Sequence, residues 1–167
     1  MPDREFDPQR ILDALAAERV RFVLIGGMAA VLHGDVGVTL DIDITPGVDE
    51  ANLDRLARAL RGLDARIRAE GVPDGLPFDC SKEFLLNLGP DAVLDLTTSA
   101  GDVDVAFMPA GTQGFDDLTR DAVAVEVAGT RVLVASLADV IRSKGAADRE
   151  KDRRALPRLR QLQERLR

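Results

Sequence analysis

Two strand patterns, joined by a pair of glycines and a short helical stretch, occupy the first third of the chain. Residues 20–25 are apolar and rich in β-branched side chains, and they end at Gly26-Gly27. The helix-compatible stretch 28–33 follows, and residues 39–45 then alternate apolar with polar side chains, which is typical of a half-buried strand. This order of strand, glycine turn, helix and strand predicts an α/β fold.

Asp41 and Asp43 stand on the polar side of the second strand pattern. Because side chains alternate along a strand, both carboxylates emerge on one face, with attachment points roughly 6.6 Å apart. Two head groups at that separation can converge on one hard cation or a pair of them. The alternative is a solvated strand whose charges discourage aggregation between sheets.

The remaining patterns alternate between helices and strands. A βαβα unit is complete by residue 62, and the chain then becomes rich in strands. A Ser-x-x-Asp capping box opens a late helix, Gly145 interrupts it, and a basic helical stretch continues with a kink or break at Pro157. The sequence predicts helices over 7–18, 49–60 and 136–144, strands over 84–88, 92–97, 103–107, 123–127 and 132–134, and a surface loop over 71–82.

Length and composition favour one domain. A chain of 167 residues can bury a sizeable core, and we divide it into a core with its N-terminal helix, 1–135, and a basic helical segment packed on it, 136–167. No apolar run approaches the length of about 20 residues that spans a bilayer. The start of the sequence lacks a secretory or transit pattern, so we expect a cytoplasmic protein that does not enter a membrane.

Charge is distributed unevenly along the chain. The net charge is −7, yet ten Lys/Arg face four Asp/Glu from Arg142 onward. An acidic body disfavours broad binding to nucleic acid, while the basic tail is either a solvated helix face or a contact for a phosphate-bearing partner. The absence of Tyr and Trp argues against RNA recognition by stacking.

Cysteine and histidine each occur once in the chain, and both side chains are candidate functional groups. Cys80 has no second cysteine to pair with, and we expect it to be structural. His33 is the only imidazole and lies near the end of the short helix, where a structural role and a substrate contact are equally well supported.

The glycine pair allows several interpretations. The Rossmann pattern Gly-x-Gly-x-x-Gly and the P-loop pattern Gly-x-x-x-x-Gly-Lys-Ser/Thr are both absent around Gly26 and Gly27. Glycines at a helix start expose backbone N–H groups where the helix dipole favours phosphate, although the pair also suits a simple tight turn.

The sequence Ile25-Gly26-Gly27, followed by Asp41-Ile42-Asp43-Ile44, resembles the nucleotidyltransferase superfamily whose founding member is DNA polymerase beta. The resemblance implies a mixed twisted sheet flanked by helices, with a C-terminal helical segment. It also implies that the glycine turn holds nucleotide phosphates and that the two aspartates bind Mg²⁺ or Mn²⁺.

The resemblance further implies a third carboxylate on a later strand. Asp104, inside the alternating segment 101–107, is our candidate for the metal site, and it could help to take a proton from the acceptor. Asp102 lies on the same face and is the rival, while Asp95 is a weaker choice.

The end of the chain is similar to the bacterial abortive-infection and toxin–antitoxin branch of these enzymes. Members often carry a Ser-Leu-x-Asp helix and a Lys…Arg-x-Lys-Asp sequence, as found here from Ser136 to Lys144 and from Arg149 to Asp152. By resemblance Lys144 approaches a nucleotide phosphate; the alternative is a helical pair with Asp148.

Two positions depart from the pattern of the family. Gly27 replaces the preferred serine of the turn, and Gly37 stands where many relatives carry a basic residue. Both differences remove possible phosphate contacts and leave the three aspartates unchanged.

The resemblance predicts a nucleotidyltransferase that moves a nucleoside monophosphate from a nucleoside triphosphate to a hydroxyl acceptor, possible acceptors being a small alcohol, an antibiotic, a protein side chain or a tRNA end. The alternative is a catalytically weak binding module with this fold that acts with a cognate protein partner in a toxin–antitoxin complex. A metal-dependent glycosyl transfer through Asp41 and Asp43 is a weaker hypothesis, because the chain is short for the usual sugar-nucleotide fold.

Overall fold

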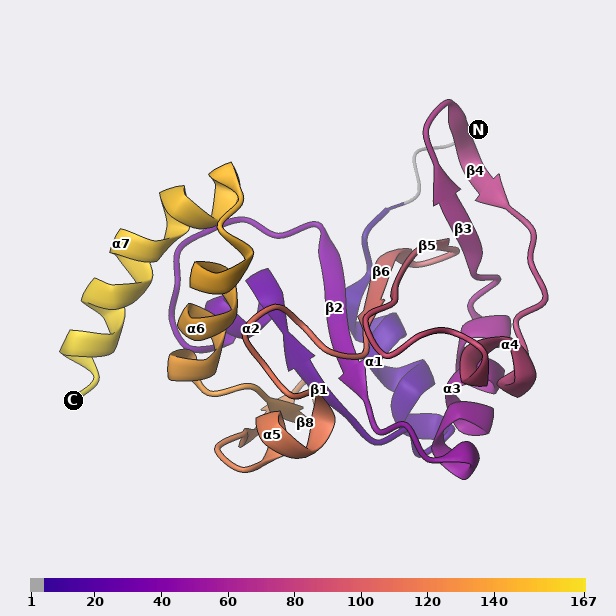
Figure 1. Ribbon diagram of the computed structural model, residues 1–167, viewed down its shortest axis with the longest axis horizontal. Helices are drawn as coiled ribbons and strands as arrows, with labels where there is room; N and C mark the ends of the chain where they lie inside the picture. Colours follow the sequence, from indigo (N-terminus) through magenta and orange to yellow (C-terminus); the bar gives the residue numbers. More distant parts are fainter. Residues whose placement is uncertain (1–4) are drawn as a thin grey trace.

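One mixed sheet organises the computed structural model, which describes residues 5–167 (Figure 1). Within these residues the strands are β1 Phe22–Ile25, β2 Asp41–Pro46, β3 Arg66–Ala69, β4 Val72–Leu76, β5 Val93–Thr98, β6 Gly101–Ala106, β7 Val123–Val127 and β8 Thr130–Val134. The helices are α1 Pro8–Ala17, α2 Gly26–Leu32, α3 Glu50–Gly62, α4 Lys82–Leu86, α5 Phe115–Thr119, α6 Leu137–Ala147 and α7 Glu150–Arg165. The sequence-based prediction of a mixed sheet flanked by helices is confirmed. The first four residues of the predicted core lie outside the described part of the chain.

The strand order β4-β3-β5-β6-β2-β1-β8-β7 places β2 inside the sheet. It pairs antiparallel with β1 and parallel with β6. In the parallel pair Asp43 lies opposite Asp104 and Asp41 lies opposite Asp102. Two segments about sixty residues apart in the sequence therefore place their aspartates on one face of the sheet.

The opposite face of the sheet forms the hydrophobic core with α1 and α3, which both contact β2. Ile42, Ile44, Val103 and Val105 are fully buried there, whereas the aspartates between them stay partly exposed. In Figure 1, α6 and α7 lie at the left of the view, and α3 and α4 lie at the lower right, below the β3–β4 hairpin. The alternation of apolar and polar residues in β2 and β6 thus gives the sheet one buried apolar face and one polar face.

Several predicted elements are present. Asp7 caps α1 by accepting a hydrogen bond from the Arg10 backbone at 3.0 Å, and Ser136 caps α6 by accepting one from the Asp139 backbone at 3.1 Å. The predicted hairpins β5–β6 and β7–β8 are both antiparallel ladders. The glycine pair is itself the first turn of α2, which starts two residues earlier than the sequence indicates.

The predicted surface loop over 71–82 is wrong in its first half. Residues 72–76 form β4, which pairs with β3, and β3 was not predicted at all. Pro73 is compatible with this strand because β4 is at the edge of the sheet, where a missing N–H breaks no inner ladder. Gly75 adopts φ +72°, where a Cβ atom would lie 2.9 Å from the Ile67 carbonyl oxygen. Proline and glycine therefore mark an irregular edge strand here.

The predicted strand over 84–88 is also wrong, because residues 82–86 form α4. Ser81 accepts a hydrogen bond from the Phe84 backbone at 3.1 Å and caps the helix. The Phe84 ring packs against Phe78, with ring centroids 5.1 Å apart. The cap and this local packing favour a helical turn over a short apolar strand. The short helix α5 is also absent from the elements predicted from the sequence.

The C-terminal helices are more regular than the sequence suggests. Gly145 does not interrupt α6, which ends when Asp148 adopts the left-handed conformation at φ +51°. The sequence predicts a kink or a break at Pro157, and the break is absent because helix α7 runs through this residue. An ion pair between Arg158 and Asp35 ties α7 to the loop after α2. No helix within residues 5–167 combines the length and the apolar character needed to cross a membrane.

A buried asparagine joins three segments near the end of β2. The Asn52 side chain accepts from the Arg21 backbone N–H at 2.7 Å, and it donates to the carbonyls of Arg21 at 2.9 Å and Gly47 at 2.7 Å. Asn52 is fully buried, so these backbone groups have no access to water when the amide is absent.

We expect Asn52→Ala to lower the free energy of unfolding by about 2–4 kcal/mol, because it leaves buried backbone groups unsatisfied. Urea unfolding followed by circular dichroism measures this loss. Gln161→Ala, which truncates an exposed amide on α7, is the matched control and should change stability by less than about 0.5 kcal/mol. Equal effects of the two substitutions would contradict the bridging role of Asn52.

Candidate active site

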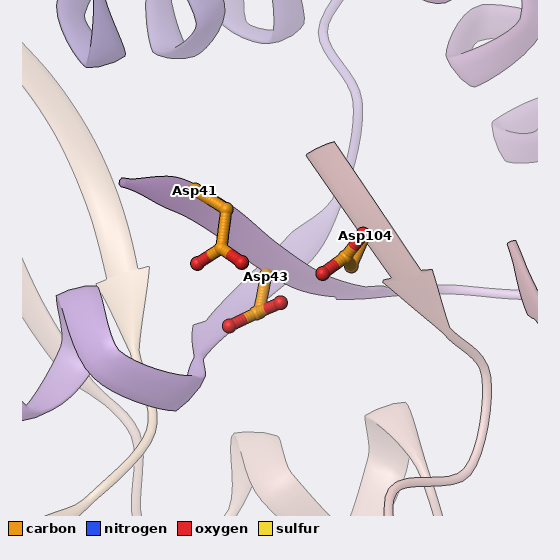
Figure 2. A group of neighbouring side chains, drawn as sticks. All are labelled: Asp41, Asp43 and Asp104. Atoms are coloured by element: carbon orange, nitrogen blue, oxygen red, sulfur yellow. The ribbon is translucent and has the colours of Figure 1, made fainter. Parts of the chain in front are cut away.

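Asp41, Asp43 and Asp104 gather their carboxylates on the polar face of the sheet (Figure 2). One oxygen from each side chain lies within 4.8 Å of the others. Strand β2 supplies the first two and β6 the third, and all three residues are partly exposed. The structure therefore brings together the three residues that the sequence selects.

The two rival carboxylates lie outside this cluster. Asp102 directs its carboxylate to Arg68, with an N–O distance of 3.2 Å, and the Asp95 side chain is 58% exposed. Asp95 does lie directly across the β5–β6 ladder from Asp104. Among the described residues, only Asp104 joins Asp41 and Asp43 in a group with the geometry of a metal site.

Burial and mutual repulsion change the acidity of two of these carboxyls. Burial, followed by the charge of Asp41, raises the pKa of Asp43 to about 6. Burial and the charge of Asp43 raise the pKa of Asp104 to about 8, although the Arg68 guanidinium acts in the opposite direction. Without a cation, the site therefore disfavours the fully ionised form.

This donor set fits a divalent cation. Three carboxylates offer the hard oxygen ligands that Mg²⁺ and Mn²⁺ prefer. The raised pKa values of Asp43 and Asp104 show that their negative charges are not fully balanced by the protein. A bound cation would supply that balance, and Asp41, Asp43 and Asp104 are the residues that would hold it.

The glycine turn at the start of α2 lies directly against this cluster. Gly26 has φ +68°, and a Cβ atom there would collide with the Asp43 carboxylate. At Gly27 a Cβ atom would lie 3.1 Å from Thr39 Oγ1, and that hydroxyl donates to Asp41 Oδ1 at 3.3 Å. The threonine hydroxyl thus lies beside Gly27, the position at which the resemblance to the superfamily predicts a serine.

Cationic side chains from α6 and α7 border the other side of a pocket of about 360 Å³, which Gly26, Asp43 and Asp104 also line. Lys144 lines this pocket and pairs with the buried Asp152 at 3.6 Å, and not with Asp148, which was the alternative to a phosphate contact. Arg149 and Lys151 complete this border, and Gly27 is not part of the lining. Carboxylates and cations therefore line a single cavity.

Asp152 fixes the position of Lys144. Burial opposes its ionised form, but hydrogen bonds from the Arg149 side chain and backbone lower the pKa of Asp152. The charged Asp152 then holds Lys144 at the pocket. The Lys144 side chain is 17% exposed, so its ammonium group remains accessible from the cavity.

His33 has a structural role. Its Nε2 atom donates to the Ala135 carbonyl at 2.7 Å, and the Ala135 N–H donates to the Leu24 carbonyl at 2.9 Å. The imidazole thereby connects the end of α2 to the start of α6. Cys80 is buried, and burial raises the pKa of its thiol to about 11, which agrees with the predicted structural role.

Sequence reasoning missed Arg68, the cation nearest to the aspartates. Its guanidinium contacts Asp104 and Asp102 from β3. The alternation Arg66-Ile67-Arg68 was the available signal, but a strand of four residues flanked by glycine and acidic residues is too short to identify by period alone.

Comparisons with solved structures agree with this architecture. A protein from Thermotoga maritima, described provisionally as a nucleotidyltransferase, has a TM-score of 0.57 and 18% identity over 93% of this chain and 95% of that one. The lincosamide antibiotic adenylyltransferase LnuA has a TM-score of 0.60 and 16% identity over 95% and 99%. The antibiotic-resistance factor ANT(2'')-Ia has a TM-score of 0.57 and 16% identity over 96% and 82%. No protein-family model and no curated protein sequence matches the chain.

The chain therefore has the nucleotidyltransferase-superfamily fold. The similarity extends over nearly the whole chain, and the predicted resemblance to this superfamily is confirmed at the level of the fold. The toxin–antitoxin branch stays a prediction from the sequence.

We expect Gly26→Ala to lower the free energy of unfolding by about 1–2 kcal/mol, because alanine is strained at the positive φ of this position. The added Cβ atom should also displace the Asp43 carboxylate and thereby weaken Mn²⁺ binding. Thermal unfolding and calorimetric Mn²⁺ titration measure the two effects. Gly145→Ala is the matched control, because a Cβ atom at that helical position meets nothing within 4 Å. Wild-type Mn²⁺ affinity in a folded Gly26→Ala protein would contradict the contact with Asp43.

We also expect Mn²⁺ affinity to rise with pH between 6 and 8. Protons occupy Asp43 below about pH 6 and Asp104 below about pH 8, and a cation must displace them. Proton competition is therefore strongest at low pH and disappears as pH rises through these values. Titrations at pH 6 and pH 8 should differ in dissociation constant by about tenfold or more. An affinity independent of pH would show that neither carboxyl is a ligand.

Proposed function

We propose that the protein is a metal-dependent nucleotidyltransferase that moves a nucleoside monophosphate from a nucleoside triphosphate to a hydroxyl acceptor. The observation that carries this proposal is the convergence of Asp41, Asp43 and Asp104 beside the Gly26 turn. The fold similarity to nucleotidyltransferases and adenylyltransferases supports it.

Each side of the pocket has a distinct part in binding. Asp41, Asp43 and Asp104 would hold Mg²⁺ or Mn²⁺. When bound, the cation supplies Lewis-acid stabilisation of the charge that develops on phosphate oxygens. The Gly26 backbone lines the pocket and would lie beside the phosphates, and Lys144 and Lys151, which line the same pocket, would supply positive charge.

The reaction is an in-line displacement at the α-phosphorus. The acceptor oxygen forms a bond to that phosphorus, and the bond to the oxygen bridging the α- and β-phosphates breaks, which releases pyrophosphate. The acceptor proton passes to Asp104, the carboxylate that the later strand β6 contributes to the cluster. Lys144 and Lys151 stabilise the leaving pyrophosphate through their charges.

The donor and acceptor proposed for the first assays follow from the neighbours. LnuA is an adenylyltransferase by name and was solved with lincomycin bound, so we propose ATP as donor and a small hydroxylated molecule as acceptor. The pocket of about 360 Å³ has an apolar wall, formed by residues such as Pro109, Val140 and Ala147, that suits a nucleobase or a drug-sized acceptor.

A second candidate function is a binding module that acts with a cognate protein partner in a toxin–antitoxin pair. The observation that favours it is the apolar strip formed by Val36, Val38 and Leu40, which are 84%, 91% and 72% exposed. This strip leads directly into Asp41, and exposed apolar patches mark contact surfaces. Stable co-purification with one partner, without nucleotide binding, would favour this candidate.

We expect Asp41→Asn and Asp104→Asn each to lower nucleotidyl transfer by about 10³-fold or more with the fold intact, because each removes a cation ligand. Asp102→Asn, which changes a carboxylate on the same strand outside the cluster, should keep transfer within about tenfold. Pyrophosphate release from ATP, GTP, CTP and UTP with a panel of hydroxylated acceptors measures the rates. Unchanged turnover in Asp104→Asn would overturn the assignment.

A further inference from the structure

Arg68 occupies an unusual position beside the proposed metal site. It extends from β3, and the β3–β5 register places Ile67 opposite Leu96, so that Arg68 follows in the row of Asp95. Asp95 lies opposite Asp104, which in turn lies opposite Asp43. One row across four strands of the sheet thus contains a guanidinium followed by three carboxylates.

The Arg68 guanidinium forms ion pairs with more than one carboxylate. It contacts Asp104 directly, its Nη1 lies 3.2 Å from Asp102 Oδ2, and its Nη2 lies 4.0 Å from Asp95 Oδ1. The Arg68 side chain is 34% exposed, and within residues 5–167 its ion pairs all go to Asp95, Asp102 and Asp104. Arg68 is therefore the internal counter-ion of the acidic face.

Asp104 has two competing partners. The same carboxylate belongs to the cluster that would hold a divalent cation. An oxygen that accepts a guanidinium N–H donates less charge to a metal, and two positive centres close to one carboxylate repel each other. A cation that binds with all three aspartates must therefore weaken the contact between Arg68 and Asp104.

We propose that Arg68 is a positioning residue that holds Asp104 in the metal-free site, and that metal binding displaces its guanidinium from Asp104 onto Asp102 and Asp95. The inference rests on the metal site of the proposed function. The displacement breaks no covalent bond and needs only a change of side-chain rotamer.

The surroundings of Arg68 keep the free-energy cost of moving its guanidinium from Asp104 to Asp102 and Asp95 low. Asp102 and Asp95 remain beside the guanidinium, and their side chains are 38% and 58% exposed. Arginine has several donors, so it can leave one carboxylate and keep another. Solvent also screens the charges at this partly exposed position.

Calorimetric titration of Mn²⁺ into the wild type, Arg68→Ala and Arg66→Ala tests the proposal. Arg68→Ala removes the competing guanidinium, so we expect Mn²⁺ to bind about fivefold more tightly. Arg66→Ala removes the same charge two positions away, where the side chain donates to the Gly75 carbonyl at 3.3 Å, and should leave the affinity unchanged. Weaker or unchanged Mn²⁺ binding in Arg68→Ala would overturn the proposal.

A double-mutant cycle locates the competition at Asp104. With Asp104→Asn as background, the further change Arg68→Ala should no longer tighten Mn²⁺ binding, because the contested carboxylate is absent. The same fivefold gain in both backgrounds would show a general charge effect and overturn the exchange. Absence of Mn²⁺ binding in the wild type and in every variant would instead overturn the metal site itself.

Nuclear magnetic resonance of the wild type gives a second readout if Arg68→Ala fails to fold. The Nε–Hε signal of Arg68, assigned by its loss in Arg68→Lys, should move on addition of Mg²⁺, while the Arg66 signal stays in place. A fixed Arg68 signal at saturating Mg²⁺ would overturn the proposal.

Discussion

The parallel pairing of β2 with β6 is the constraint on which the rest of the site depends. Its register places Asp43 opposite Asp104, and the strand period turns Asp41 to the same face. The intervening Ile42 and Val103 are fully buried against the helices on the other face. A shift of one residue would bury the carboxylates and expose the core, so the packing of the hydrophobic face enforces the geometry of the polar face.

The sequence predicts correctly those parts of the fold in which the local pattern of apolar and polar residues matches the burial that the tertiary structure imposes. In β2 and β6 the alternation of aspartate with aliphatic residues encodes which side is buried, and the hairpin turns between β5 and β6 follow from residues 99–102. Asp41, Asp43 and Asp104 were accessible to sequence reasoning because they lie in such patterns. Their mutual approach is a consequence of the strand order, whereas the resemblance to the superfamily implied only a third carboxylate on a later strand.

The parts that could not be predicted depend on contacts outside their own segment. Strand β4 contains Pro73 and Gly75, which indicate a loop, and it is a strand only because β3 pairs with it. Helix α4 has an apolar run that suits a strand, yet the Ser81 cap decides its conformation. Arg68 belongs to the same group, since its importance comes from two neighbouring strands that bring Asp102 and Asp104 within reach.

Cationic side chains approach the negatively charged aspartates of the site from two directions. Arg68 reaches it along the sheet, whereas Lys144 and Lys151 approach from α6 and α7 across the pocket. The first cation contacts the aspartates directly, while Lys144 is held by the buried Asp152 and leaves the space in front of Asp43 open. That difference matters for the proposed chemistry, because Lys144 and Lys151 line the pocket, whereas the Arg68 guanidinium is engaged by the aspartates. In the proposed function, the phosphates of a donor would lie beside Lys144 and Lys151, and the cation would lie beside the three aspartates.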